Sequence, residues 1–293
     1  MNVEQMLDLF REDFPRRSSE ITHIWAVFWA NFKIFLSYRT WVITETMSTV
    51  ASIVMYSFMG LQVDVNRFSI VGYGNVSWLA FAIVGIATAN YLWMCISRIS
   101  HSLQHEVAEG TLEPIVSSLI KLRSYIIGQS IRGFLVSSYF MFGALLIGIF
   151  VLKVPLVVTA ETLLSFIVIL VMMIVSYAGI GIMVAGIILV YKKGDPMTFI
   201  LASITEFLGG VLFPLNYLQG YPVLYGLAWS MPYTYALDAA RRVLLTGATL
   251  ISPPVLNDLA ILMIFTLVFL PSGLRTFKWG VDRIRREGTV ATY

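Results

Sequence analysis

The residues that could do chemistry gather in one short segment, HEVAEGTLEP, residues 105–114. His101, His105 and Glu109 are spaced four apart, so a helix would place their side chains on one face. Imidazole and carboxylate groups in the order H-E-x-x-E can bind zinc in hydrolases, which makes a membrane metalloenzyme one interpretation. Such a site usually needs another strong ligand, and the only other histidine is His23. We therefore expect no bound metal and keep the metalloenzyme as an alternative.

Other catalytic patterns are missing from the sequence. No G-x-x-x-x-G-K-[ST] phosphate-binding loop occurs, and the nearest stretch, GQSIRG at residues 128–133, lacks the lysine. The three histidines and the single cysteine, Cys95, form no Ser-His-Asp or Cys-His grouping. We therefore expect that the chain is not an enzyme on its own and binds no cofactor itself.

The composition indicates that these residues belong to a membrane protein. Of the 293 residues, 58% are hydrophobic and 13% are charged, whereas an average soluble domain is about 25% charged. We expect a single transmembrane domain over residues 1–293. The net charge of +3 gives no sign of a nucleic-acid partner. Residues 1–20 mix acids and bases without an apolar stretch, so they read as a cytoplasmic tail and not as a cleavable signal peptide.

Six apolar runs are candidate spans, since crossing about 30 Å of hydrocarbon takes about 20 helical residues. They cover residues 41–61, 76–97, 125–152, 160–190, 197–213 and 255–274. The third and fourth must tilt or protrude, and the fifth is short. Before them, residues 21–38 place aromatic side chains at helical spacing. This pattern predicts an interfacial amphipathic helix, with a short extra span as the alternative.

The basic residues predict the orientation of the spans. If the N-terminus is inside, most of the 20 Lys and Arg residues lie on the inner side. The positive-inside rule then places both tails, residues 1–20 and 275–293, in the cytoplasm. We expect a multi-pass protein of the plasma membrane, with residues 98–123 as its first cytoplasmic loop.

The acidic segment of that loop suits contact with another protein. The pattern predicts a short amphipathic helix, a break at Gly110, and a second helix that Thr111 opens and caps, with Glu113 and Pro114 in its first turn. Acidic side chains on a short rigid helix favour a docking surface for a cytoplasmic partner, and a solvated loop is the alternative.

Two charged residues inside the predicted spans are candidates for a transport pathway, because charge within a membrane is costly. Glu206 lies about halfway along the fifth span and should face the interior of the bundle. Arg132 lies about two turns into the third span, where it could pair with Glu206 or extend to the inner headgroups. A structural hydrogen bond is the alternative role for Glu206.

The segment after the fifth span is apolar but interrupted by prolines and glycines, which predicts short re-entrant helices that form an extracellular gate. The gate candidates are Phe213, Pro214, Tyr217, Tyr221, Trp229 and Pro232. An aromatic belt at the outer interface is the alternative role for these aromatic residues. In the last of these helices, Asp238 can pair with Arg241 or Arg242.

Two segments together resemble a known family. The order E-G-T-L-E after the second span, and the block GGVLFPLNYLQGYPVLYGLAWSMPYTYALDAARRVLLTG at residues 209–247, are similar to the membrane subunits of ABC-2 type exporters. Pro114 directly after Glu113 departs from the family pattern, which places a proline several residues later. The resemblance implies an all-α permease with six spans, cytoplasmic termini and a coupling helix over residues 101–113.

The resemblance also implies the partners and the function. The coupling residues that would dock on a separate ATPase subunit are His105, Glu106, Glu109, Gly110, Thr111, Leu112 and Glu113. ATP and Mg would be bound by that subunit, and a second permease, identical or closely homologous, would complete the pathway. The expected cargo of such a prokaryotic exporter is an amphiphilic drug, lipid or peptide, with polysaccharide or glycolipid as the alternative. A membrane scaffold without transport activity remains a third possibility.

Overall fold

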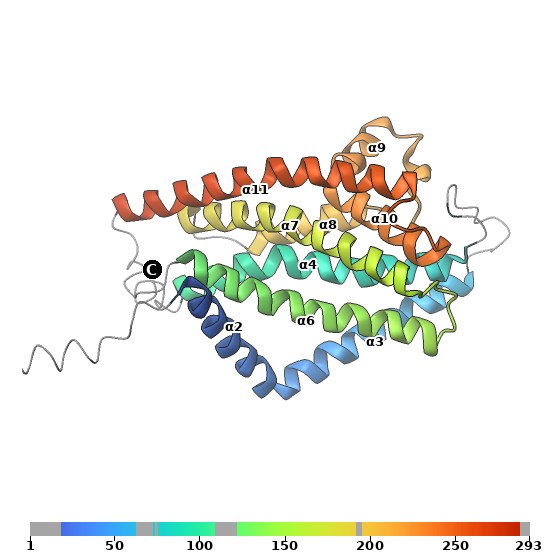
Figure 1. Ribbon diagram of the computed structural model, residues 1–293, viewed down its shortest axis with the longest axis horizontal. Helices are drawn as coiled ribbons and strands as arrows, with labels where there is room; N and C mark the ends of the chain where they lie inside the picture. The colour runs from blue at the N-terminus through green and yellow to red at the C-terminus, as the bar shows by residue number, and fades with distance from the viewer. Residues whose placement is uncertain (1–18, 63–72, 74–75, 109–121, 192–194, 288–293) are drawn as a thin grey trace, which may run out of the picture.

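The computed structural model describes residues 19–62, 73, 76–108, 122–191 and 195–287, and these residues contain helices and no strand (Figure 1). The elements are α2 (Glu20–Ser37), α3 (Arg39–Gln62), α4 (Trp78–Ala108), α6 (Leu122–Phe150), α7 (Ala160–Tyr191), α8 (Asp195–Leu208), η1 (Leu215–Leu218), α9 (Pro222–Trp229), α10 (Pro232–Thr246) and α11 (Pro253–Glu287). The predicted all-α class is confirmed.

Three of these helices are long and apolar enough to cross a membrane. The candidate spans are Ile127–Phe150 in α6, Ala160–Ile188 in α7 and Pro253–Arg283 in α11. Two shorter apolar helical segments, Trp78–Trp93 and Pro196–Leu208, coincide with the second and fifth predicted spans. The membrane class therefore stands, while the count of six spans stays a prediction.

Helix lengths differ from the expectation at three places. Helix α4 continues to Ala108, so the first helix of the predicted cytoplasmic loop is an extension of the second span. Helix α8 has 14 residues and ends at Leu208, because Gly209 and Gly210 follow and Gly210 adopts a positive φ of 74°. Helix α11 runs 35 residues and stays helical past Pro271.

Helices α7 and α11 lie side by side along much of their length (Figure 1). Glycines allow the contact, since a Cβ added to Gly273 would lie 2.1 Å from the carbonyl oxygen of Gly179. One added to Gly280 would lie 2.3 Å from the carbonyl oxygen of Gly186. Each helix advances seven residues between the two contacts, so the helices run parallel. Gly179 and Gly186 therefore allow close packing between two helices of the same chain.

The central and peripheral helices differ in burial. Helix α4 occupies the core, where it packs against α6, α7, α8 and α10, and residues 80–84 are at most 1% exposed. Helices α2 and α3 instead form two arms of a V whose apex points away from the bundle (Figure 1). Among the α3 residues whose side chains are described, Ile53 alone is buried.

Candidate functional site

Helix α10, predicted as part of an outer gate, lies in the core. It begins with Pro232 at its first turn, where the missing N–H costs no hydrogen bond, and it ends at Gly247 in a left-handed conformation. Most of its 15 residues are buried against α4, α7 and α11. The helix is therefore held rigidly, and it carries the charged side chains that organise this end of the molecule.

Arg241 joins three elements through backbone carbonyls. Its guanidinium donates to the carbonyl oxygens of Gly210 at 2.8 Å, Val211 at 2.6 Å and Phe81 at 3.2 Å. Gly210 and Val211 follow the C-terminus of α8, where carbonyl groups lack helical partners and a cation is favoured. Burial lowers the pKa of Arg241 to about 10, so the side chain stays protonated at neutral pH.

The guanidinium also stacks on an aromatic ring. Its central carbon lies 3.3 Å from the centroid of the Phe81 ring, and Arg241 is only 3% exposed. The planar, weakly hydrated guanidinium is suited to such a buried stacked position, which an ammonium group would fill poorly. Arg241 therefore fastens α10 to the start of α4 and to the turn after α8.

Glycines allow the backbone to approach this side chain. A Cβ added to Gly85 would lie 2.2 Å from the carbonyl oxygen of Val211 and 2.6 Å from Arg241 Nη2. A Cβ added to Gly209 would lie 2.4 Å from the Tyr233 ring, which is fully buried. The site is thus closely packed, as expected for a structural node.

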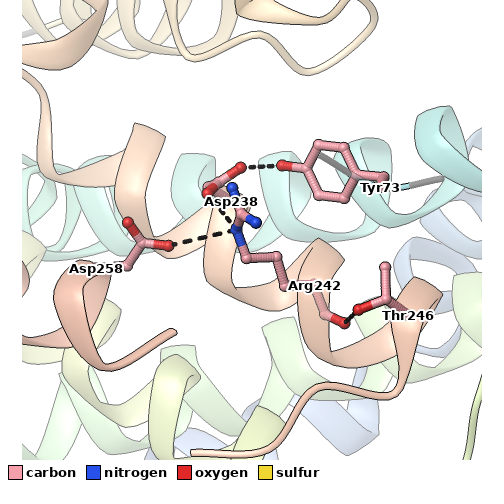
Figure 2. Close-up of polar contacts among 5 residues, drawn as sticks. All are labelled: Tyr73, Asp238, Arg242, Thr246 and Asp258. Atoms are coloured by element: carbon pink, nitrogen blue, oxygen red, sulfur yellow. Dashed lines mark hydrogen bonds and ion pairs between the residues drawn. The ribbon is translucent and has the colours of Figure 1, made fainter. Parts of the chain in front are cut away.

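A second group of polar side chains surrounds Asp238 and Arg242, as Figure 2 shows. The Tyr73 hydroxyl donates to Asp238 Oδ1, and Arg242 Nε donates to Asp238 Oδ2 at 2.7 Å. Asp258, on α11, has its Oδ2 4.0 Å from Arg242 Nε, and Thr246 Oγ1 donates to the carbonyl oxygen of Arg242 at 2.6 Å. The cluster thereby links α10, α11 and the segment that precedes α4.

Burial and charge act together on this cluster. Burial, followed by the nearby Asp238 carboxylate, raises the pKa of Tyr73 well above 10, so the phenol remains a hydrogen-bond donor. Partial burial lowers the pKa of Arg242, but attraction to Asp238 outweighs it and the net pKa is raised. Direct hydrogen bonds join Tyr73 and Arg242 to Asp238, so the geometry of the cluster suits holding helices together.

The two predicted pathway residues are not brought together. Glu206 Oε2 accepts a hydrogen bond of 2.5 Å from Trp93 Nε1 on α4, and the Trp93 ring lies 5.7 Å from the Phe199 ring. Arg132 Nε is buried without a hydrogen-bond partner in the part of the chain that the structure describes. No ion pair joins Arg132 and Glu206 among those residues. The Glu206 contact agrees with the structural alternative, and its role in transport stays a prediction.

The predicted gate residues separate into exposed and packed groups. Tyr217 and Tyr221 are 57% and 65% exposed, around η1 and the start of α9. Trp229 contacts the Tyr235 ring at 5.2 Å and is half-buried. The other three gate candidates lie near the ends of the short helices. Phe213 packs on Phe207, Pro214 precedes η1, and Pro232 begins α10.

The predicted coupling residues lie at the edge of the described structure. His105 and Glu106 lie in the last turns of α4, whereas Glu109, Gly110, Thr111, Leu112 and Glu113 fall outside the described residues. Within the described ranges, no group of three or more His, Cys, Asp or Glu side chains could hold a metal. Part of the H-E-x-x-E segment lies beyond those ranges, so the docking surface and the metalloenzyme alternative both stay predictions.

Sequence reasoning missed three residues of the site, Tyr73, Trp93 and Asp258. Tyr73 and Asp238 are 165 positions apart, and Trp93 and Glu206 are 113 apart. A charge near the start of an apolar run was the one available signal for Asp258. The expected pairing of Asp238 is confirmed with Arg242, while Arg241 binds carbonyl groups.

A comparison with protein families gives one match. The family model described as ABC-2 type transporter matches residues 22–245. No individual curated protein matches the chain. The matched region runs from the first turn of α2 to the last turn of α10, so it includes the acidic segment after α4 and the buried Arg241.

Proposed function

Because the family match covers most of its length, the chain belongs to the ABC-2 type transporter family as a membrane component, and we propose that it is the permease of an ATP-driven exporter. This proposal rests on the family match over residues 22–245. The permease domain itself is not catalytic, and permeases of this family typically work with an ATPase subunit. The absence of a phosphate-binding loop from the sequence supports a separate ATPase.

The acidic segment after α4 is the proposed docking surface for that ATPase. Helix α4 is continuous to Ala108, so movement of the segment would pass directly into the central helix of the bundle. A rigid helix transmits displacement better than a flexible loop, provided that the ATPase binds ATP differently in the two states of the permease. The proposed working unit is two permeases with two ATPases in a prokaryotic plasma membrane.

The proposed cargo is an amphiphilic drug, lipid or peptide. Apolar side chains exposed on α3 and α8, including Met47, Phe58, Phe199 and Phe207, support an apolar surface for a partner permease or cargo. Glu206 adds a carboxylate on α8, near these residues in sequence. A polysaccharide or glycolipid cargo would instead favour additional hydrogen-bonding groups along the pathway.

The first experiment identifies the proteins that co-purify with the tagged chain from its native membrane in mild detergent, by mass spectrometry. We expect a stoichiometric ATPase that carries a phosphate-binding loop. Absence of such a subunit, together with bound zinc or iron, would favour the metalloenzyme alternative.

A second experiment tests the docking surface. Reversal of charge in Glu109→Lys or Glu113→Lys should abolish permease-coupled ATP hydrolysis, because the acidic side chains would meet basic groups on the ATPase. Membrane insertion should be unchanged, which cell fractionation checks. Coupled hydrolysis at the normal rate in both variants would contradict the assignment.

A third experiment tests Glu206. The Glu206→Gln side chain can still accept the hydrogen bond from Trp93, so assembly should be retained. Contact with a cationic or polar part of the cargo predicts reduced transport in this variant. Normal transport would leave Glu206 with the structural role alone.

A further inference from the structure

A groove of about 630 Å³ lies between α2, α3 and α6. Its lining includes Phe32, Leu36, Arg39, Ile43, Leu135 and Tyr139. Figure 1 shows α2 and α3 meeting at an angle beside α6, and the lining residues come from around that junction. The volume is within the range of about 300–1,000 Å³ that is typical of ligand pockets.

The chemistry of the lining favours an apolar occupant over water. Apart from Arg39 and the Tyr139 hydroxyl, the lining side chains are hydrocarbon. Apolar cavities of proteins stay dry because water finds no hydrogen-bond partners in them. The surroundings of a membrane helix bundle supply acyl chains, which match a long apolar groove in chemistry.

Two guanidinium groups lie next to this apolar surface. Arg39 is part of the lining. Arg132 lies one helical turn before Leu135 and Val136, which form the α6 wall, so it is on the same face of α6. Its Nε is buried and has no hydrogen-bond partner among the described residues.

A guanidinium whose buried Nε lacks an acceptor among the described residues, beside an apolar groove, suits an anionic, amphiphilic ligand. Guanidinium groups bind phosphate oxygens through paired hydrogen bonds. Basic pockets between membrane helices on the cytoplasmic side bind phospholipid headgroups. The predicted orientation places the start of α6 on that side, since α6 follows the first cytoplasmic loop.

We infer that the groove binds one phospholipid of the bilayer, with an acyl chain between α2, α3 and α6 and the phosphate at Arg39 and Arg132. The lipid fills a volume that the polypeptide leaves open and gives Arg132 the partner that the described chain lacks. This site does not depend on the exporter proposal, because it requires only insertion of the chain in a bilayer.

Native mass spectrometry tests the inference. The full chain, with any subunit that co-purifies, is reconstituted in nanodiscs with equal parts of phosphatidylcholine and phosphatidylglycerol and then released into detergent. We expect one retained phospholipid per chain, enriched in phosphatidylglycerol. Absence of a retained phospholipid would overturn the inference.

Two variants fill the groove from different helices. Leu135→Trp acts from α6 and Ile43→Trp acts from α3, so failure of one variant to fold leaves the other. Leu146→Trp is the matched control, because Leu146 is as exposed as Leu135, at 51% and 49%, and lies on the same helix outside the groove. The retained lipid should disappear from the two groove variants and remain in the control. Equal retention in all three, or equal loss, contradicts the site.

The charge of the site is tested separately. Each of Arg39→Gln and Arg132→Gln should reduce the preference for phosphatidylglycerol about fivefold, the effect of one basic side chain near a membrane surface. Lys278→Gln is the control, since Lys278 is an exposed cation on α11, across the bundle from α2 and α3 (Figure 1). An unchanged preference in both arginine variants would contradict the binding of the phosphate by Arg39 and Arg132.

A dimer of two chains that is lost in the groove variants, with no retained lipid, would identify a second copy as the occupant instead.

Discussion

Arg241 and Arg132 are both arginines in helices of an apolar bundle, yet their surroundings differ. Arg241 donates to three backbone carbonyls from two other segments of the chain and stacks on Phe81. Arg132 has a buried Nε that no described residue accepts from. The two Nη atoms of Arg241 are bonded within the fold and hold it together, although its Nε, like that of Arg132, is buried without an acceptor among the described residues. The Arg132 side chain has no hydrogen bond to any described residue and lies on the α6 face that lines the groove, which is why it points to a ligand.

The helices around these two arginines differ in the same way. Around Arg241, α4 and α10 are buried on most sides and glycines allow backbone contact. Near Arg132 in α6, α2 and α3 form a V whose apex points away from the bundle, and they enclose a groove with α6. The comparison indicates a rigid end of the molecule that fixes geometry and a more open region that is available for binding.

Replacement of Arg241 should have the largest effect on stability. Arg241→Met leaves the carbonyl oxygens of Gly210, Val211 and Phe81 buried without their donor. Each unpaired buried group costs about 1–3 kcal/mol, so the total loss should reach at least about 3 kcal/mol. Thermal unfolding in detergent should show a Tm lower by on the order of 10 °C. A Tm equal to that of the unmodified protein would contradict the role of Arg241 as a structural link.

The glycine contact between α7 and α11 should come next. Gly273→Ala places a methyl group against the backbone of Gly179, and overpacking of this kind costs about 1–3 kcal/mol. Gly143→Ala is the matched control, because a Cβ at Gly143 in α6 meets nothing within 4 Å. Thermal unfolding should show destabilisation in the first variant alone. Equal Tm values for the two variants would mean that α7 and α11 accommodate the added methyl group without a loss of stability.

Replacement of Arg132 should have the smallest effect on stability and completes the comparison. Arg132→Met removes a side chain whose Nε makes no hydrogen bond within the described chain. In delipidated detergent solution we expect a change in stability of less than about 0.5 kcal/mol, as for substitutions that break no internal contact. Measurement of Tm beside Arg241→Met under the same conditions checks this. A loss as large as that of Arg241→Met would place Arg132 among the structural residues.

Local patterns were sufficient for much of the fold. The apolar run at residues 160–190 predicted α7, which spans Ala160–Tyr191, because a long continuous apolar stretch has few other stable solutions in a bilayer. The aromatic periodicity of residues 21–38 likewise predicted α2 at Glu20–Ser37. The end of α4 was predicted too early, at residue 97. Polar residues interrupt the apolar pattern there, but the helical hydrogen bonds do not require an apolar side chain.

The site was less accessible to sequence reasoning. Asp238 and Arg242 are four residues apart on one helix, so helical geometry alone predicted their pair. The hydrogen bond between Trp93 and Glu206 depends on how α4 and α8 pack. The sequence of neither segment contains a signal that identifies the other as its partner. The proposed pairing of Glu206 with Arg132 was therefore not found among the described residues, although both charges had been identified as unusual.

The sequence by itself determined the membrane class, the positions of most helices and the absence of a phosphate-binding loop, because these properties depend on composition, on short-range periodicity or on a contiguous motif. The tertiary structure decided which charges have partners. The sequence alone does not distinguish Arg241 from Arg132. Only the packing of distant segments brings three carbonyl oxygens to the Nη atoms of Arg241 and brings no hydrogen-bond acceptor from the described residues to Arg132.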